Sequence, residues 1–498
     1  MPRPLNRAHV EWWREADGVP RRVVKVLHAD GDTLRAGIAA IQHELGVTPE
    51  FPAEVERAAA AAARHPRMPD LDRTDIPFVT IDPPSSMDLD QAVHLERDGD
   101  GFVVHYAIAD VAAFVSPGDA VDEEANRRGE TLYGADSKVP LHPKVLSEGA
   151  ASLLPDEDRP ALLWTIRVDG DGEGTDVDVV RAVVRSRAKL DYGTLQKDVD
   201  AGRADAMFGL LAEVGQLRKK REAARGGVSL PLPEQEIDVD GDAWSLSFRR
   251  MLPVEEWNAQ ISLLTGMGAA SLMVKARVGL LRTLPPPDDL DVQRLHRTAK
   301  ALGIDWPDAQ LYPDFIRALD PRQANHAAMV VACTRLLRGS GYVAFNGEVP
   351  EQPEHSALAS EYAHVTAPLR RLGDRYAGEI CLALCAGVDV PGWVIDRLDQ
   401  LPKTLQESGR KAHQYENSIL GLVEAAVLHT HVGEMFPGVV VAVEEDGEAA
   451  GKRGDVVIQQ PAIEARVTSA SELPLGTDVE VRLAEADIPS RTVRFELP

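Results

Sequence analysis

Three aspartates stand close together at Asp82, Asp88 and Asp90, where a β-prone apolar run ends in a turn and a second apolar run begins. Hard cations such as Mg²⁺ prefer oxygen ligands, and a few carboxylates together with substrate phosphates commonly hold them. Neighbouring carboxylates also repel one another unless a cation or protonation compensates their charge. The segment therefore fits a Mg²⁺ site for phosphoryl chemistry. It equally fits a solvated turn, because Asp, Pro and Ser are ordinary turn residues, and the segment alone leaves both interpretations open.

The composition is that of a large, acidic globular protein. Its 498 residues exceed what one hydrophobic core holds, so roughly two to four domains are expected. The 54 Lys and Arg against 79 Asp and Glu give a net charge of −25, which argues against a generally cationic nucleic-acid binder. A local basic channel remains compatible with this charge. Three cysteines without disulfide or zinc spacing, a polar N-terminus and no long apolar run predict a cytoplasmic protein with no membrane span.

The elements that must position these aspartates change in character along the chain. Residues 1–70 carry apolar side chains at helical spacing and predict a compact helical domain of a helix-turn-helix kind. Between 75 and 190, alternating segments separated by Asp-Gly turns predict β-hairpins with short helices. Helical patterns dominate from 195 to 430. The last unit, 431–498, has five short strands and predicts a small OB-type barrel, which serves either oligonucleotide binding or protein contacts.

Four motifs, met in order along the chain, resemble those of the ribonuclease II family, the RNB-domain exoribonucleases. The acidic segment at 82–92 looks like the metal motif of that family, and 105–115 looks like its strand that ends in an Asp. The segment at 139–147 is similar to a third motif. The segment at 355–375 looks like the basic motif near the scissile phosphate. Four ordered matches favour the metal site over the polar turn.

The resemblance implies an α+β fold. An RNB catalytic domain at 71–430, a mixed β-sheet wrapped by helices, would lie between the helical domain at 1–70 and the OB-type RNA-binding barrel at 431–498. The implied activity is processive, hydrolytic degradation of single-stranded RNA from its 3′ end to nucleoside 5′-monophosphates. The resemblance also implies one or two Mg²⁺ ions, for which Mn²⁺ can substitute, and a monomer.

The metal-site roles follow from matches to the family pattern. Asp82 and Asp88 match metal ligands, and Asp90 matches the catalytic residue that sets up the attacking water or a second metal. Gln91 stands where the family pattern has a fourth Asp. Its amide oxygen can ligate Mg²⁺ without bringing charge. Alternatively Gln91 faces away and another carboxylate substitutes, for which Asp110 is a candidate.

The basic motif supplies the second group of roles. Arg370 matches the arginine that the family places on the phosphate in the transition state, and its planar guanidinium suits phosphate oxygens. Arg371 and Arg375 follow and are expected to contribute to RNA binding. Asp374 is expected to orient these arginines through salt bridges rather than to touch metal.

Aromatic contacts and departures from the family pattern complete the prediction. Tyr133 and Tyr192 match family aromatics near the RNA 3′ end, where stacking is worth ~1–3 kcal/mol per base without reading sequence. Asn258 and Ala259 stand where the family commonly has a pair of acidic residues, and His413 replaces its usual Glu, which weakens any transfer of RNA-over-DNA discrimination. Gln91, Ala259 and His413 motivate a second hypothesis, a catalytically weak RNA-binding protein that keeps the fold.

Two further regions bear on RNA access. Familiar bacterial members of the family carry two cold-shock β-barrels before the catalytic domain, where residues 1–70 predict helices. A more open channel entrance, tolerant of structured RNA, is therefore expected. The basic run at 218–221 either lines this channel or ends a solvated helix.

Overall fold

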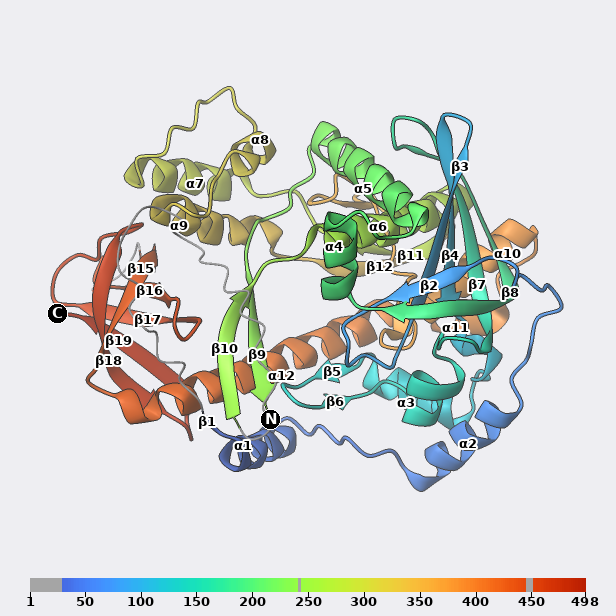
Figure 1. Ribbon diagram of the computed structural model, residues 1–498, viewed down its shortest axis with the longest axis horizontal. Helices are drawn as coiled ribbons and strands as arrows, with labels where there is room; N and C mark the ends of the chain where they lie inside the picture. The colour runs from blue at the N-terminus through green and yellow to red at the C-terminus, as the bar shows by residue number, and fades with distance from the viewer. Residues whose placement is uncertain (1–28, 241–242, 445–450) are drawn as a thin grey trace.

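Two closed five-stranded β-barrels, joined and covered by helices, organise the chain (Figure 1). The computed structural model describes residues 29–240, 243–444 and 451–498. The first barrel, in the order β2-β3-β4-β7-β8, consists of β2 (Phe78–Ile81), β3 (Gln91–Asp98), β4 (Gly101–Ala109), β7 (Asp158–Val168) and β8 (Gly174–Leu190). The second, in the order β15-β16-β17-β19-β18, consists of β15 (Met435–Val443), β16 (Arg453–Ile458), β17 (Ile463–Ser469), β18 (Asp478–Asp487) and β19 (Thr492–Leu497).

The first barrel confirms the hairpins predicted from the alternating segments. β4 pairs antiparallel with β3 and β7, and Tyr106 of β4 stands opposite Trp164 of β7 with both side chains buried in the core. β2 pairs parallel with β8, with Ile81 beside Leu190, and this contact closes the barrel. The predicted mixed sheet is therefore present, and it closes on itself. The five strands predicted after residue 431 are also confirmed, as the second barrel.

Long helices cover the first barrel and connect it to the second. α5 (Ala206–Arg225), α6 (Pro253–Ala276) and α10 (Leu372–Ala386) contribute apolar side chains to the core around the first barrel. α12 (Leu401–Leu428) runs from this core to the second barrel (Figure 1). Neither these helices nor any other in the described part of the chain combines the length and apolar character needed to cross a membrane.

The described part of residues 1–70 does not form a domain of its own, so the predicted compact domain is wrong there. Its helices α1 (Gly31–Glu44) and α2 (Ala53–Arg64) exist as predicted, but they pack into two different cores. Leu34 of α1 joins the core around α12, while Val55 of α2 joins the core beside β2. Amphipathic spacing predicts a helix but not the partner of its apolar face. The predictions for residues 1–28 lie outside the described residues.

Between residues 195 and 430 the predicted helices are present, but the strand pairs that lie between them were not predicted. β9 (Glu234–Asp240) and β10 (Ala243–Arg249) form a hairpin that is extended by β1 (Ala29–Asp30), and Trp244 of β10 is fully buried against the α12 core. Between the paired strands β11 (Val278–Thr283) and β12 (Gly341–Asn346) lies a helical insertion, residues 284–340. Its helices are α7 (Asp289–Ala301), α8 (Tyr312–Arg317) and α9 (Ala324–Cys333), and they pack on the second barrel.

Candidate active site

The loop between β2 and β3, which carries the candidate aspartates, is fixed at both of its halves. Lys189 Nζ donates hydrogen bonds to the carbonyl oxygens of Pro84 (2.7 Å) and Ser86 (2.5 Å). Ser152 is fully buried, and its Oγ accepts from Leu89 N at 2.9 Å while donating to a neighbouring loop carbonyl at 2.7 Å. These bonds hold the loop backbone in one conformation, so its carboxylates are preorganised.

Asp90, the last residue before β3, joins the acidic loop to the basic motif. Its side chain is 6% exposed, and its Oδ1 accepts a hydrogen bond from Leu369 N at 2.8 Å. Its Oδ2 lies 3.6 Å from Arg370 Nε. Burial raises the pKa of Asp90 to about 8, although Arg370 and the Leu369 N–H act in the opposite direction. The structure therefore brings together two motifs that lie far apart in the sequence.

Asp82 and Asp88 complete an acidic cluster with a shortage of positive charge. Lys138 Nζ donates to Asp88 Oδ1 at 2.6 Å, but Glu148 lies 3.1 Å from the same ammonium. Burial, followed by the negative charge of Asp88, raises the pKa of Asp82 to about 6. Such crowded carboxylates favour a bound cation.

The carboxylates of the acidic cluster fit Mg²⁺ only together with ligands from substrate and water. Among the described residues, no three His, Cys, Asp or Glu side chains are grouped closely enough to hold a metal ion by themselves. Mg²⁺ is usually held by one or two carboxylates together with substrate phosphates and water, so it does not need a cage made of protein alone. Asp82, Asp88 and Asp90 supply oxygen donors of this kind.

Gln91, the predicted fourth ligand, has both polar atoms of its amide in other bonds. Tyr106 Oη donates to Gln91 Oε1 at 2.6 Å, and Gln91 Nε2 donates to the carbonyl oxygen of Thr366 at 2.8 Å. The Tyr106 hydroxyl also lies 2.7 Å from Ser262 Oγ. Gln91 thus ties the start of β3 to the segment that carries Arg370. Ligation of Mg²⁺ by this side chain stays a prediction that these bonds disfavour.

Asp110, the alternative fourth carboxylate, is engaged elsewhere. Its side chain is 2% exposed and accepts a hydrogen bond from Arg181 Nε at 2.9 Å. Arg181 also bonds Glu379, so the three side chains form an ion network in which both carboxylates are buried. Asp110 is therefore not free to replace a missing ligand.

The three predicted arginines have different surroundings. Arg370 keeps 41% of its side chain exposed beside Asp90. Arg371 makes a two-bond pair with Asp374, at 2.9 and 2.7 Å, and Asp374 also accepts from Ala367 N at 2.8 Å. As predicted, Asp374 orients an arginine, and this pair shapes the backbone that presents Arg370.

Arg375 does not lie where RNA could reach it, and the prediction of an RNA contact there is wrong. It is 4% exposed, and its Nη1 is 2.5 Å from Asp122 Oδ1. It is the fourth residue of α10, on a face that packs into the protein. A buried charge of this kind needs its partner, so the pair is structural. Helical position, which the motif did not reveal, separates Arg375 from Arg370.

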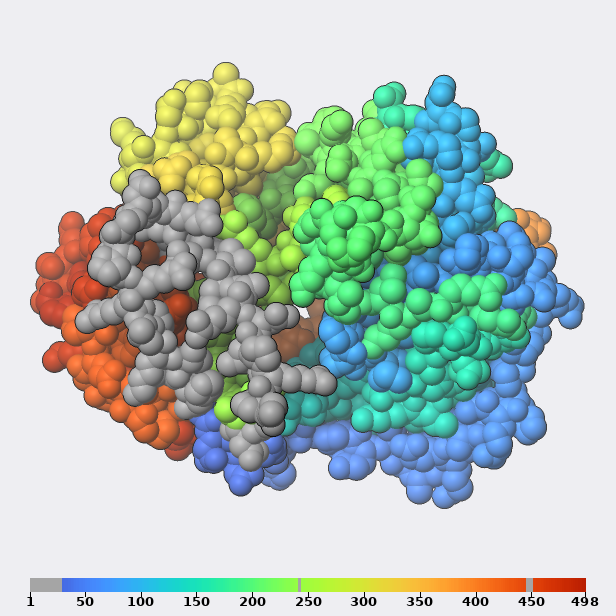
Figure 2. Space-filling view, in the orientation of Figure 1, coloured from blue at the N-terminus to red at the C-terminus, as the bar shows by residue number. Residues whose placement is uncertain are grey.

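Two tyrosines flank the acidic loop from different elements. Tyr133 lies in β5 (Leu132–Tyr133), is 39% exposed, and has its pKa raised to about 12 by burial, with influence from Arg370. Tyr192 begins α4 (Tyr192–Asp200), and its hydroxyl accepts from Asn258 Nδ2 at 3.0 Å. Figure 2 shows the surface hollowed at the centre of this face, between α4 and the segment of β5. The two tyrosines thus belong to the elements that border this hollow.

The basic run at 218–221 and two lysines beside the acidic loop remain to be compared with the prediction. In the basic run at 218–221, Arg218 is 1% exposed and so cannot line a channel, whereas Lys219 is exposed and pairs with Glu256 at 2.5 Å. Lys138 and Lys189, which hold the acidic loop, were not predicted as site residues. Their only signal in the sequence is that each stands beside a recognised motif or tyrosine.

Comparison with known proteins gives two family matches. The model of the RNB domain matches residues 71–384, and that of the RNase II-type exonuclease C-terminal S1 domain matches residues 434–497. Ribonuclease R of Vibrio cholerae is 27% identical over 470 residues, which cover 86% of this chain and 55% of that protein. Ribonuclease R of Escherichia coli (strain K12) is 27% identical over 465 residues, covering 85% and 55%. The chain spans about half the length of the curated relatives it matches.

Solved structures share the fold. Mycoplasma genitalium RNase R in complex with ribose methylated single-stranded RNA matches with a TM-score of 0.82 and 20% identity, covering 94% of this chain and 78% of that one. The same enzyme in complex with double-stranded RNA gives 0.80 and 21%, covering 94% and 84%. Yeast Ssd1, described as a pseudonuclease, gives 0.68 and 15%, covering 87% and 55%.

Proposed function

Because the chain belongs to the RNB-domain family, we propose that it is a processive exoribonuclease that hydrolyses single-stranded RNA from the 3′ end with Mg²⁺. The products would be nucleoside 5′-monophosphates. The observation that carries the proposal is the junction of Asp90 with Arg370, a buried carboxylate 3.6 Å from a half-exposed guanidinium, next to two more aspartates. The relatives named Ribonuclease R support the same activity.

The side chains divide the work of phosphodiester hydrolysis. The exposed guanidinium of Arg370 would contact the non-bridging oxygens of the scissile phosphate, where negative charge develops. Asp90 Oδ2, the carboxylate oxygen that does not accept from Leu369 N, would orient the attacking water. Mg²⁺, or Mn²⁺ in its place, would be held by Asp82 and Asp88 and would supply positive charge for the phosphoryl and leaving oxygens.

The tyrosines would hold the RNA end without reading its sequence. A base stacked on Tyr133 or Tyr192 gains ~1–3 kcal/mol whatever its identity. Asn258 fixes the hydroxyl of Tyr192, which keeps that ring in one orientation. Because the faces of the bases in a duplex are already stacked on neighbouring base pairs, this arrangement favours a single strand at the active site.

The test uses 5′-labelled single-stranded RNA with Mg²⁺ or with EDTA. Wild-type protein with Mg²⁺ should release mononucleotides from the 3′ end, and Asp90→Asn should bind the RNA without cutting it. Asp98→Asn is the matched control, since it removes an exposed carboxylate at the other end of β3. Internal fragments, or no cleavage by the wild type, would contradict the proposal. A hairpin with a 3′ overhang in the same assay tests the predicted tolerance of structured RNA.

A second candidate function is RNA binding without cleavage. It is favoured by Gln91, whose amide is used in the Tyr106 and Thr366 bonds and so leaves three carboxylates at the site. The likeness to the fold of yeast Ssd1, a pseudonuclease, is compatible with it. In the same assay this function predicts that the wild type and Asp90→Asn bind RNA equally and that neither shortens it.

A further inference from the structure

The second barrel lacks an exposed surface for base stacking. Phe436 and Phe495 are its only aromatic residues from 435 to 498, and both rings are buried in its core. Among its arginines, Arg466, Arg482 and Arg494 are paired with acidic side chains. Proteins that bind single strands without sequence preference combine unpaired cations with aromatic rings. The barrel alone does not offer this combination.

The helical insertion at 284–340 is firmly attached to this barrel. Its apolar side chains share one core with Val439, Val441 and Val457, which project from two strands of the barrel. Within the insertion, Asn325 Nδ2 donates to the carbonyl oxygen of Leu302 at 3.1 Å and so links α9 to the end of α7. The insertion is therefore a fixed extension of the barrel surface.

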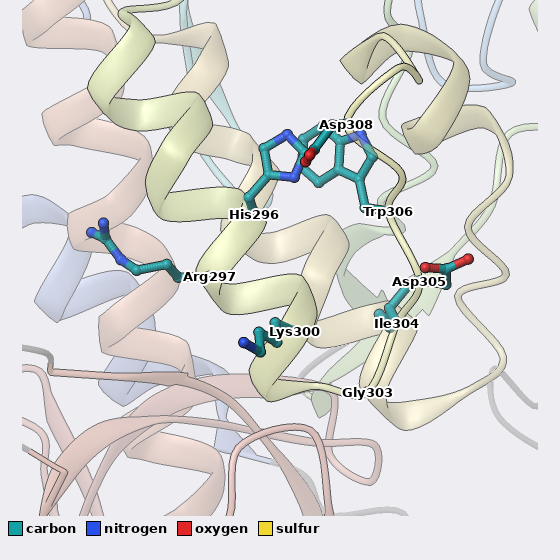
Figure 3. A pocket seen from close by; sticks show the side chains of 8 residues that line it. All are labelled: His296, Arg297, Lys300, Gly303, Ile304, Asp305, Trp306 and Asp308. Atoms are coloured by element: carbon teal, nitrogen blue, oxygen red, sulfur yellow. The ribbon is translucent and has the colours of Figure 1, made fainter.

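The insertion carries an aromatic column that ends at a pocket (Figure 3). The Trp306 ring stacks on Phe315, with centroids 4.0 Å apart, and the His296 ring stacks on Trp306 at 3.8 Å. Trp306 Nε1 donates to the carbonyl oxygen of Gln310 at 3.0 Å, which fixes the central ring. Phe315 and Trp306 are buried, whereas His296 is half-buried and lines the pocket of about 510 Å³.

Charged side chains surround the same pocket. Arg297 and Lys300 of α7 are exposed and have no acidic partner among the described residues. Lys300 is four residues after His296, so both lie on one face of α7. Asp305 and Asp308 line the pocket from the following loop, and Figure 3 shows Asp305 on the side opposite Arg297.

We propose that this pocket binds one nucleotide of the single-stranded RNA, upstream of the 3′ end that enters the active site. The base stacks on His296, and Arg297 and Lys300 contact its phosphate. Asp305 and Asp308 accept hydrogen bonds from ribose hydroxyls, and their charge disfavours a longer run of phosphates. The inference rests on the proposed function, because it takes the ligand to be the RNA substrate.

Fluorescence anisotropy of the full chain with labelled oligoadenylate tests the pocket, in the Asp90→Asn background to prevent cutting. His296→Ala should weaken binding about 5-fold or more, and His296→Phe, which keeps a ring, should restore it. Lys300→Ala should lower the slope of log K against log salt by about 0.7. Arg338→Ala removes an exposed cation elsewhere on the insertion and should change affinity less than 2-fold.

Two results would refute the proposal that the pocket binds RNA. One is binding by His296→Ala and Lys300→Ala that stays within 2-fold of the parent, and the other is a His296→Phe variant as weak as His296→Ala. A cleavage assay distinguishes failure of the pocket proposal from failure of the proposed exoribonuclease function. Because the insertion packs on the second barrel, away from the active-site elements in Figure 1, a tetranucleotide bound at the active site is expected to end before the pocket. With Asp90 intact, the wild type should shorten this tetranucleotide whether or not the pocket binds RNA, and a wild type that cuts no RNA refutes only the proposed function.

Discussion

Replacing Gln91 by Glu exchanges one amide NH₂ group for an oxygen and leaves the shape of the side chain almost unchanged. The bond from Tyr106 Oη, 2.6 Å, can remain. The bond from Nε2 to the carbonyl oxygen of Thr366, 2.8 Å, is lost, and two oxygen atoms then face each other in a segment where Thr366 is 4% exposed. Leaving a buried acceptor unsatisfied costs about 1–3 kcal/mol, which is the expected loss in the free energy of unfolding.

The pH dependence of this loss has a definite sign. A protonated Glu can donate to the Thr366 carbonyl, so the folded protein favours the protonated form and raises the pKa of the new carboxyl. The destabilisation of Gln91→Glu should therefore grow as pH rises. Tyr106→Phe removes the other bond of the same amide. A double-mutant cycle between the two positions should give a coupling of about 0.5–3 kcal/mol.

Urea denaturation of the wild type and Gln91→Glu, with and without Mg²⁺, is the assay. If Gln91 bridges Tyr106 and Thr366, the ion should stabilise both proteins by the same amount, because a ligand stabilises only through its own affinity for the folded state. If Gln91 ligates Mg²⁺, the added charge should tighten binding. Two results together would refute the bridging role. Without Mg²⁺, Gln91→Glu would be as stable as the wild type, and it would be stabilised by lower Mg²⁺ concentrations than the wild type.

Three further predictions concern catalysis, packing and pH. Arg370→Ala should lower kcat/KM about 10²–10³-fold. The urea midpoint should change little, because the side chain is 41% exposed. A loss of activity that only follows a loss of folded protein would argue against a catalytic role. Arg375→Met leaves Asp122 buried without its partner and should cost about 3–5 kcal/mol of stability while the folded fraction keeps its RNA affinity. Burial raises the pKa of Glu424 from 4.5 to about 7, so its charged form weakens the fold as pH rises through this range. Glu424→Gln, which keeps the oxygen that accepts from Gln235, should raise the melting temperature above pH 7 but not near pH 4.

Local sequence was sufficient for the parts of the site that a short segment defines. The order of apolar run, turn and alternating aspartates is enough to predict a loop between two strands, and Asp82, Asp88 and Asp90 do lie on or beside that loop. Tyr133 and Tyr192 were predicted as aromatics near the site, and charges of the site influence both hydroxyls. The alternation of apolar and polar residues likewise predicted the hairpins of both barrels, because this two-residue period can be read from a few neighbouring residues.

The rest depended on partners distant in sequence. Gln91 bonds Thr366, 275 residues away, and no local pattern indicates which way the amide faces. Arg375 looks like a continuation of the Arg370 motif, yet one turn of α10 carries it into the protein. The hairpin of β9 and β10 is stabilised by burial of Trp244 against α12 rather than by its own composition. In each case tertiary packing, rather than propensity, decided the outcome.

The 28 residues of α12 have a mechanical and thermodynamic consequence. At 1.5 Å per residue the helix is a rod of about 42 Å. Leu401 and Leu405 near its start belong to the core of the first barrel, and Tyr415 and Ile419 further along belong to the core that includes the second. Melting either end would therefore expose apolar surface shared with the other. We expect a single heat-absorption peak in calorimetry, and a chain cut after α12 should lose its catalytic half to proteolysis instead of keeping it as a free-standing fragment.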